Sequence, residues 1–155
     1  MSKQGELAYQ YFMQGFNCSQ SVAAAFSKAL GLPEESVLRM TAGFGAGMGR
    51  LREVCGAFSG AVFVLSCLYG SADPSQKSQL YARVQELADR YRSQNGGNSI
   101  VCRELLGLRR AEGSPQASDR TEEYYRKRPC PQLVRLSADL LSDYLATHPI
   151  PGATL

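Results

Sequence analysis

The sequence predicts an all-α fold, a single-domain helical bundle with a central apolar helix and a glycine-rich loop. Apolar residues recur at helical spacing along most of the chain, and no segment alternates apolar and polar residues as a half-buried strand does. The length of 155 residues, 44% of them hydrophobic, fits one domain with its own core. We expect this domain to span residues 1–155, with its core over about 5–147, because no linker or repeat divides the chain.

The first three predicted helices are bounded by residues that start or stop helices. Glu6–Phe16 carries apolar side chains at helical spacing. Cys18–Leu30 follows Asn17, a residue type that caps helix N-termini, and precedes Gly31, a residue type that ends helices. Pro33 begins a short third helix, because proline suits the first helical turn.

After this helix comes the glycine-rich segment 43–50, followed by the predicted central helix, Cys55–Tyr69. It is apolar on nearly every side, so we expect it to be buried. The remaining predicted elements are a long amphipathic helix from Asp73 to Asn95, a short helix over Ile100–Leu106, a polar loop over Leu108–Arg128 and a last helix between Pro131 and Pro149.

Charge, hydropathy and histidine content argue against several classes of function. The 17 Lys and Arg exceed the 14 Asp and Glu by only three, so no nucleic acid is expected as a partner. The most apolar run, Ala57–Tyr69, is shorter than the roughly 20 residues of a membrane span. No secretory signal opens the chain, so we expect a cytoplasmic protein. The single histidine, His148, leaves no multi-histidine metal site.

The five cysteines are the strongest functional signal. Cys67 lies within the central helix, where we expect an ordinary core residue. The other four begin predicted helices, whose N-termini present unpaired N–H groups and about half a positive charge, which favours the thiolate. Each also leads the apolar stripe of its helix, so we expect four thiols to point inward and meet in one cavity. These four are Cys18, Cys55, Cys102 and Cys130.

These residues by themselves leave three chemistries open. In thiol–disulfide exchange or electron transfer, Cys55 is the candidate reactive thiolate, and one of the other three cysteines is the resolving partner that completes the disulfide. This chemistry implies a redox partner, which the sequence does not identify. In metal binding, all four ligate an iron–sulfur cluster or Zn²⁺, since four thiolates suit both. In a structural or partner-binding domain without redox activity, the cysteines only pack, and no cofactor is bound. The oligomeric state, including a homodimer, is left open.

The glycine-rich segment is interpreted as backbone that passes close beside the cysteines and tolerates positive φ. Its N–H groups are placed to hydrogen-bond thiolates or cluster sulfides. Arg50 and Arg52 precede Cys55 and would lower the pKa of its thiol on contact, although loop arginines are usually solvated. The candidate cofactor-binding positions are Gly45, Gly47, Gly49 and Gly56.

Several segments around the cysteines resemble the redox-active C_GCAxxG_C_C family. They are Phe16–Val22, Gly43–Arg50, Cys55–Ala61 (CGAFSGA), Cys102–Gly107 and Cys130–Val134. The resemblance covers about Leu7 to Leu145 and implies a small helical protein with a redox or cluster-binding role, carried by the four cysteines that begin helices. The sequence departs from the family pattern at Cys67, which the pattern does not require, and at 52–54, where family members often have smaller residues.

Overall fold

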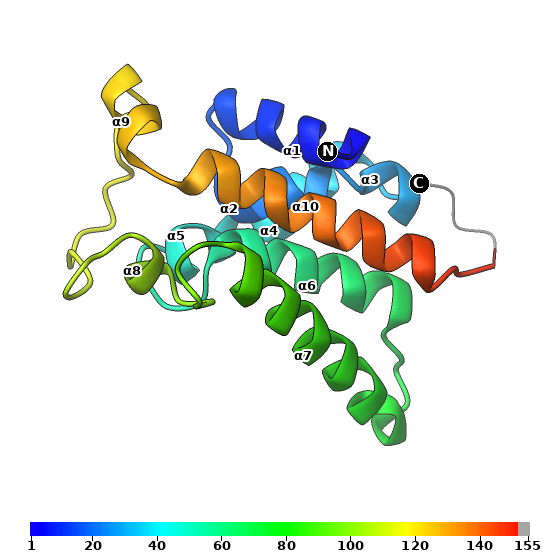
Figure 1. Cartoon of the computed structure of the whole chain (residues 1–155). Coiled ribbons are helices and arrows are strands. Elements are labelled where there is room, and N and C mark those ends of the chain that lie inside the picture. Colours follow the sequence, from blue (N-terminus) through cyan, green and yellow to red (C-terminus); the bar gives the residue numbers. More distant parts are fainter. Residues whose placement is uncertain (152–155) are drawn as a thin grey trace.

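Helices and their connections make up residues 1–151, the part of the chain that the computed structural model describes (Figure 1). This part contains no strand, and its one isolated antiparallel bridge joins Val54 to Val101. The predicted all-α class is therefore confirmed. The predicted single domain over 1–155 includes residues 152–155, which lie outside the described part.

The helices differ widely in length, and the longest two are α7 and α10. In chain order the elements are α1 (Lys3–Met13), α2 (Cys18–Ala24), α3 (Ser27–Leu30), α4 (Glu34–Thr41), η1 (Ala42–Phe44), α5 (Gly45–Met48), α6 (Gly56–Tyr69), η2 (Pro74–Gln76), α7 (Lys77–Gln94), α8 (Cys102–Leu105), α9 (Glu122–Lys127) and α10 (Cys130–Thr147). None of them, within residues 1–151, combines the length and the apolar character that crossing a bilayer requires.

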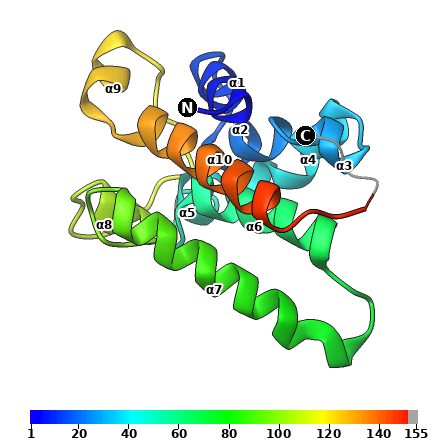
Figure 2. The ribbon, with the colours of Figure 1, turned by 45° about the vertical axis from the view of Figure 1, so that its right-hand side comes forward.

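The core forms where α6 meets α2, α7 and α10, and α1 covers the other side of α10 (Figures 1 and 2). Gly60 lets α6 approach α2 closely, because a Cβ at this position would lie 2.6 Å from the carbonyl oxygen of Ser19. Ser137 of α10 donates a hydrogen bond of 2.7 Å to the carbonyl oxygen of Ala57. These contacts join the first turns of α6 to the start of α2 and to the middle of α10.

The first helix begins and ends three residues earlier than predicted, and two predicted elements differ from the structure by more than their end residues. The single helix expected over Cys18–Leu30 is broken at Phe26, whose backbone leaves the helical region (φ −108°, ψ 7°) and whose side chain is buried in the core. Within the loop expected over Leu108–Arg128, the structure has α9. Thr121 caps this helix by accepting a hydrogen bond from the backbone N–H of Tyr124. The local capping signal was therefore present in a segment whose polarity suggested a loop.

Cys67 is exposed, and the prediction of a core cysteine was wrong. Helix α6 is buried where α2, α7 and α10 pack against it, but near its C-terminal end one face, including Ser66 and Cys67, lies open. An apolar groove of about 440 Å³ borders the same helix and is lined by Phe58, Val62 and Phe63 among others. Apolar residues all around a helix therefore did not mean burial all around it.

Candidate functional site

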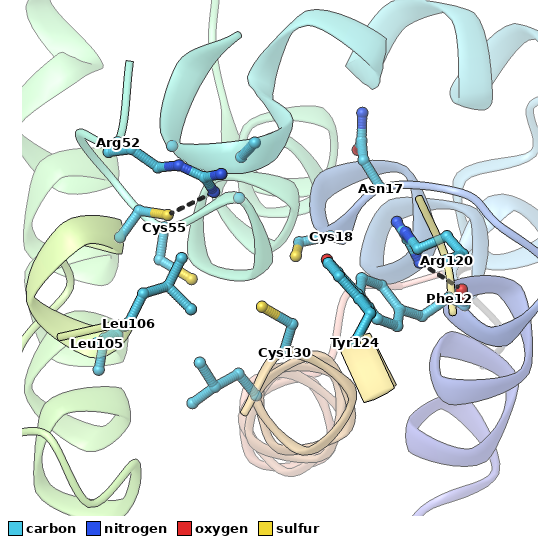
Figure 3. Close-up of a pocket in the computed structure, with 15 residues that line it drawn as sticks. Phe12, Asn17, Cys18, Arg52, Cys55, Leu105, Leu106, Arg120, Tyr124 and Cys130 are labelled. Atoms are coloured by element: carbon cyan, nitrogen blue, oxygen red, sulfur yellow. Dashed lines mark hydrogen bonds between the residues drawn. The ribbon is translucent and has the colours of Figure 1, made fainter. Parts of the chain in front are cut away.

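Four cysteine side chains line one small cavity of about 50 Å³ at the meeting point of the helix N-termini (Figure 3). Each of the four is less than one-tenth exposed. They are the four residues that the sequence singles out: Cys18, Cys55, Cys102 and Cys130. The exposed Cys67 does not line the cavity.

Helix starts position all four sulfur atoms. Cys18, Cys102 and Cys130 are the first residues of α2, α8 and α10, and Cys55 is the N-cap of α6. The start of α2 is held by a capping box in which the side chain of Asn17 accepts from the backbone of Gln20 and the Gln20 side chain accepts from the backbone of Asn17.

Backbone hydrogen bonds join the segments that carry Cys55 and Cys102. The N–H of Cys55 donates to the carbonyl oxygen of Ile100 at 2.7 Å, and the N–H of Cys102 donates to that of Glu53 at 2.6 Å. The two bonds flank the isolated bridge between Val54 and Val101. Two cysteines 47 positions apart are thus brought to one wall of the cavity by local backbone pairing.

The glycine-rich segment makes a left-handed turn in which every residue from 46 to 50 has positive φ. Gly47 is tightly packed, because a Cβ there would lie 2.6 Å from both the Cβ of Cys102 and the Cα of Arg52. Gly45 and Gly56 pack against Asn17 and Cys18, respectively, whereas a Cβ added at Gly49 would have only one atom within 4 Å. Three of the four candidate glycines therefore adjoin the cysteine segments.

Cys18 and Cys130 face each other across the cavity (Figure 3). A hydrogen bond from the Cys18 thiol lowers the pKa of Cys130 to about 7, and the guanidinium groups of Arg128, Arg52 and Arg120 lower it further against the opposing effect of burial. The same hydrogen bond, together with burial, raises the pKa of Cys18 well above its usual value. Negative charge is therefore favoured on Cys130 and disfavoured on Cys18.

Cys55 and Cys102 have different partners. Burial raises the pKa of Cys55 to about 11, although the hydroxyl of Tyr91, 3.4 Å from its sulfur, and N–H groups at the start of α6 oppose this rise. Burial also raises the pKa of Cys102, although Arg52 donates a 3.7 Å hydrogen bond to its sulfur and opposes the rise. The thiolate expected at Cys55 is therefore disfavoured, because desolvation outweighs the helix N-terminus.

Arg52 contacts Cys102 rather than Cys55, and it is buried rather than solvated. Three further residues at the site were not identified in the sequence. Tyr91 was assigned only to the apolar face of a long helix, and Glu112 and Arg120 fell within the expected loop. Residue type and spacing did not distinguish them from solvated or packing residues.

Four thiolates are a donor set suited to Zn²⁺ or an iron–sulfur cluster, but their arrangement here is not that of a ligand set. Over residues 1–151, no three Cys, His, Asp or Glu side chains are grouped as one metal ion needs. Arg52 and Tyr91 instead hydrogen-bond two of the sulfur atoms. The cavity therefore holds cysteine side chains of which two have polar partners from the protein.

Comparison with known proteins places this arrangement in a family context. No curated protein and no solved structure matches the chain. One family profile, described as "Putative redox-active protein (C_GCAxxG_C_C)", matches residues 16–144 and so includes all four cysteines of the cavity. The match covers most of the chain, and the protein therefore belongs to the C_GCAxxG_C_C family of redox-active proteins.

Proposed function

We propose that this protein exchanges electrons through a reversible disulfide between Cys18 and Cys130. The observation that carries the proposal is that Cys18 and Cys130 face each other across the cavity, with the pKa of Cys130 lowered to about 7 and that of Cys18 raised. Such a pair supplies a nucleophile at neutral pH and a second thiol that stays protonated until the first has reacted.

The reaction begins at Cys130. Its thiolate attacks one sulfur of a substrate disulfide, the S–S bond of the substrate breaks, and a mixed disulfide forms while one substrate thiolate leaves. That thiolate takes up the proton of Cys18. The sulfur of Cys18 then attacks the Cys130 sulfur and displaces the second substrate thiolate, which takes a proton from water. The substrate disulfide is reduced by two electrons, and the cysteine pair is oxidised to a disulfide.

The surrounding cations support Cys130 as the attacking residue. Arg128, Arg52 and Arg120 all stabilise its negative charge, whereas no such set acts on Cys55. Cys55 and Cys102 are assigned to the polar wall of the cavity, where they contact Tyr91 and Arg52. A dithiol acting in this way suits a reducing compartment, and we place the protein in the cytoplasm.

The test is oxidation of the reduced protein by a small disulfide, followed by a count of free thiols and mapping of the disulfide-linked peptides. We expect the count to fall by two and the linked peptides to contain Cys18 and Cys130. In Cys130→Ser, attack on the substrate should be lost. In Cys18→Ser, the mixed disulfide should accumulate. Cys67→Ser is the matched control and should behave like the wild type, because this cysteine lies outside the cavity.

Two results would overturn the proposal. A disulfide that maps to Cys55 and Cys102 would assign the chemistry to the other pair. Protein purified without oxygen that contains metal in stoichiometric amount, or absorbs visible light as iron–sulfur proteins do, would show that the thiols rearrange into a ligand set. Loss of that metal in Cys55→Ser but not in Cys67→Ser would then identify the ligands.

A further inference from the structure

A second, polar pocket of about 240 Å³ adjoins the cysteine cavity. The two share part of their walls, including Asn17, Arg52, Arg120 and Tyr124. We call the second one the arginine pocket, because Arg50, Arg52 and Arg120 line it, and no acidic side chain within residues 1–151 is among its lining residues. The arginine pocket therefore lies directly beside the cysteine cavity.

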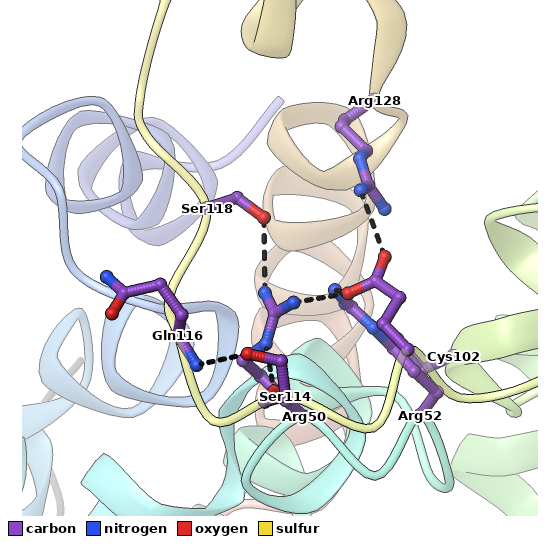
Figure 4. Close-up of polar contacts among 8 residues, drawn as sticks. Arg50, Arg52, Cys102, Ser114, Gln116, Ser118 and Arg128 are labelled. Carbon is purple, nitrogen blue, oxygen red and sulfur yellow. Dashed lines mark hydrogen bonds and ion pairs between the residues drawn. The ribbon is translucent and has the colours of Figure 1, made fainter.

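Around this pocket the arginines outnumber the acidic side chains, and Figure 4 shows three of them, Arg50, Arg52 and Arg128. The carboxylate of Glu112 pairs with Arg50, lies 3.0 Å from Arg52 and lies 3.8 Å from Arg128. Arg120 donates only to backbone carbonyl oxygens and stacks over an aromatic ring. A single carboxylate therefore lies within ion-pair distance of three guanidinium groups. The fourth, that of Arg120, has no acidic partner in the described part of the chain.

Arg52 connects the two spaces directly. Its side chain is 6% exposed, and one terminal nitrogen donates to the sulfur of Cys102 while the other donates to Glu112. Its Nε is buried and has no hydrogen-bond acceptor among residues 1–151. A buried guanidinium with an unused donor between a pocket and a thiol is unusual, since buried donors are nearly always paired. Arg52 therefore carries a positive charge at the boundary of the two spaces that its protein contacts satisfy only in part.

We propose that the arginine pocket binds the carboxylate of a small-molecule disulfide and so directs its S–S bond to the cysteine cavity. The disulfide part of this inference rests on the proposed function, whereas the binding of a carboxylate does not. Guanidinium groups match carboxylates through paired, charge-assisted hydrogen bonds. Glu112 already shows a carboxylate in contact with Arg50 and Arg52, and it competes with the ligand for them.

Binding is tested with suberate, an eight-carbon dicarboxylate that matches 3,3′-dithiodipropionate in chain length and in its two carboxylates but has no disulfide. In calorimetric titrations we expect suberate to bind the reduced protein, while 1,8-octanediol, its neutral analogue, does not. Arg50→Gln should weaken binding about ten-fold or more, since hydrogen bonds to charged groups are among the strong ones. Arg39→Gln removes the same charge from the exposed surface of α4 and should leave binding unchanged.

Glu112→Gln provides a second variant whose expected effect has the opposite sign. Removing the competing carboxylate should tighten suberate binding, which a poorly folded protein would not do. The proposed carboxylate site would be contradicted if the wild type did not bind suberate. It would also be contradicted if the wild type, Arg50→Gln and Glu112→Gln bound suberate with equal affinity.

Kinetics then separate this inference from the proposed function. We expect 3,3′-dithiodipropionate to be reduced faster than the neutral 2-hydroxyethyl disulfide, with the preference lost in Arg50→Gln. Reduction of both at equal rates would overturn the substrate class and leave the dithiol function standing. Suberate binding without reduction of either disulfide would overturn the dithiol function and leave the anion site standing. Failure of both measurements would overturn both.

Discussion

Cys18 and Cys130 are both buried at the first position of a helix, yet their pKa values move in opposite directions. Burial alone raises the pKa of each thiol, and the helix N-terminus favours both thiolates. The difference comes from their mutual hydrogen bond and from the arginines, which stabilise negative charge on Cys130. Since two adjacent thiolates repel each other, ionisation of Cys130 keeps the proton on Cys18.

A titration of thiolate absorbance tests this asymmetry. Because the pKa of Cys130 is lowered to about 7 from 9.0, thiolate should appear as the pH rises through about 7 and be absent below it. Cys18→Ala removes the hydrogen bond and should move the midpoint to higher pH, whereas Cys18→Ser keeps a donor and should move it less. Cys67→Ser should leave the midpoint unchanged. A first thiolate step near pH 9 in the wild type would contradict the assignment.

At the scale of elements, the left-handed turn around Gly47 packs directly against the segments that carry Cys102 and Arg52. Ala46, Met48 and Arg50 adopt positive φ in this turn, at a cost of roughly 1–2 kcal/mol for each such non-glycine residue. Packing against the segments of Cys102 and Arg52 offsets that cost. The turn is thus a strained element that other contacts maintain beside the site.

Gly47→Ala should destabilise the protein by at least about 1–2 kcal/mol, because φ is +69° and the new Cβ would overlap Cys102 and the backbone of Arg52. The free energy of unfolding in urea gives the measurement. Gly43→Ala is the matched control in the same segment, since it has no positive φ and nothing lies within 4 Å of its Cβ position. Equal losses in the two variants would show that the close approach at Gly47 is unimportant.

At the scale of the whole molecule, residues from four distant segments form the cavity, and the proposed disulfide joins position 18 to position 130. That link closes a loop containing most of the chain. Cross-links that close long loops reduce the conformational entropy of the unfolded state most, and typical disulfides stabilise by about 2–4 kcal/mol. Oxidation therefore couples the redox state of the site to the stability of the fold.

The oxidised protein should accordingly unfold at a temperature several degrees higher than the reduced protein, as about 2–4 °C per kcal/mol is typical of this size. Thermal unfolding followed by circular dichroism, with and without reductant, measures the difference. Cys130→Ser should show the same unfolding temperature under both conditions. If oxidation did not change the unfolding temperature of the wild-type protein, this result would be inconsistent with a disulfide between α2 and α10.

Much of the fold was predictable, because the signals are local. Asn17 before Cys18, and the apolar spacing of the long helices, identified helices that the structure contains. The break at Phe26 was not predictable from periodicity, since the pattern continues through it while tertiary packing buries the ring. Cys67 shows the same limitation, because an apolar neighbourhood along the chain did not determine whether another helix covers it.

The sequence by itself determined the helical class and placed four cysteines at helix starts, since capping residues and apolar spacing act within a few positions of the chain. Only the tertiary structure decided which thiol faces which and where the cations lie. Arg52, Arg120 and Arg128 come from separate segments, and their effect on Cys130 depends on distances that no local pattern encodes. Electrostatic energy follows separation in space, whereas helix formation follows separation along the chain.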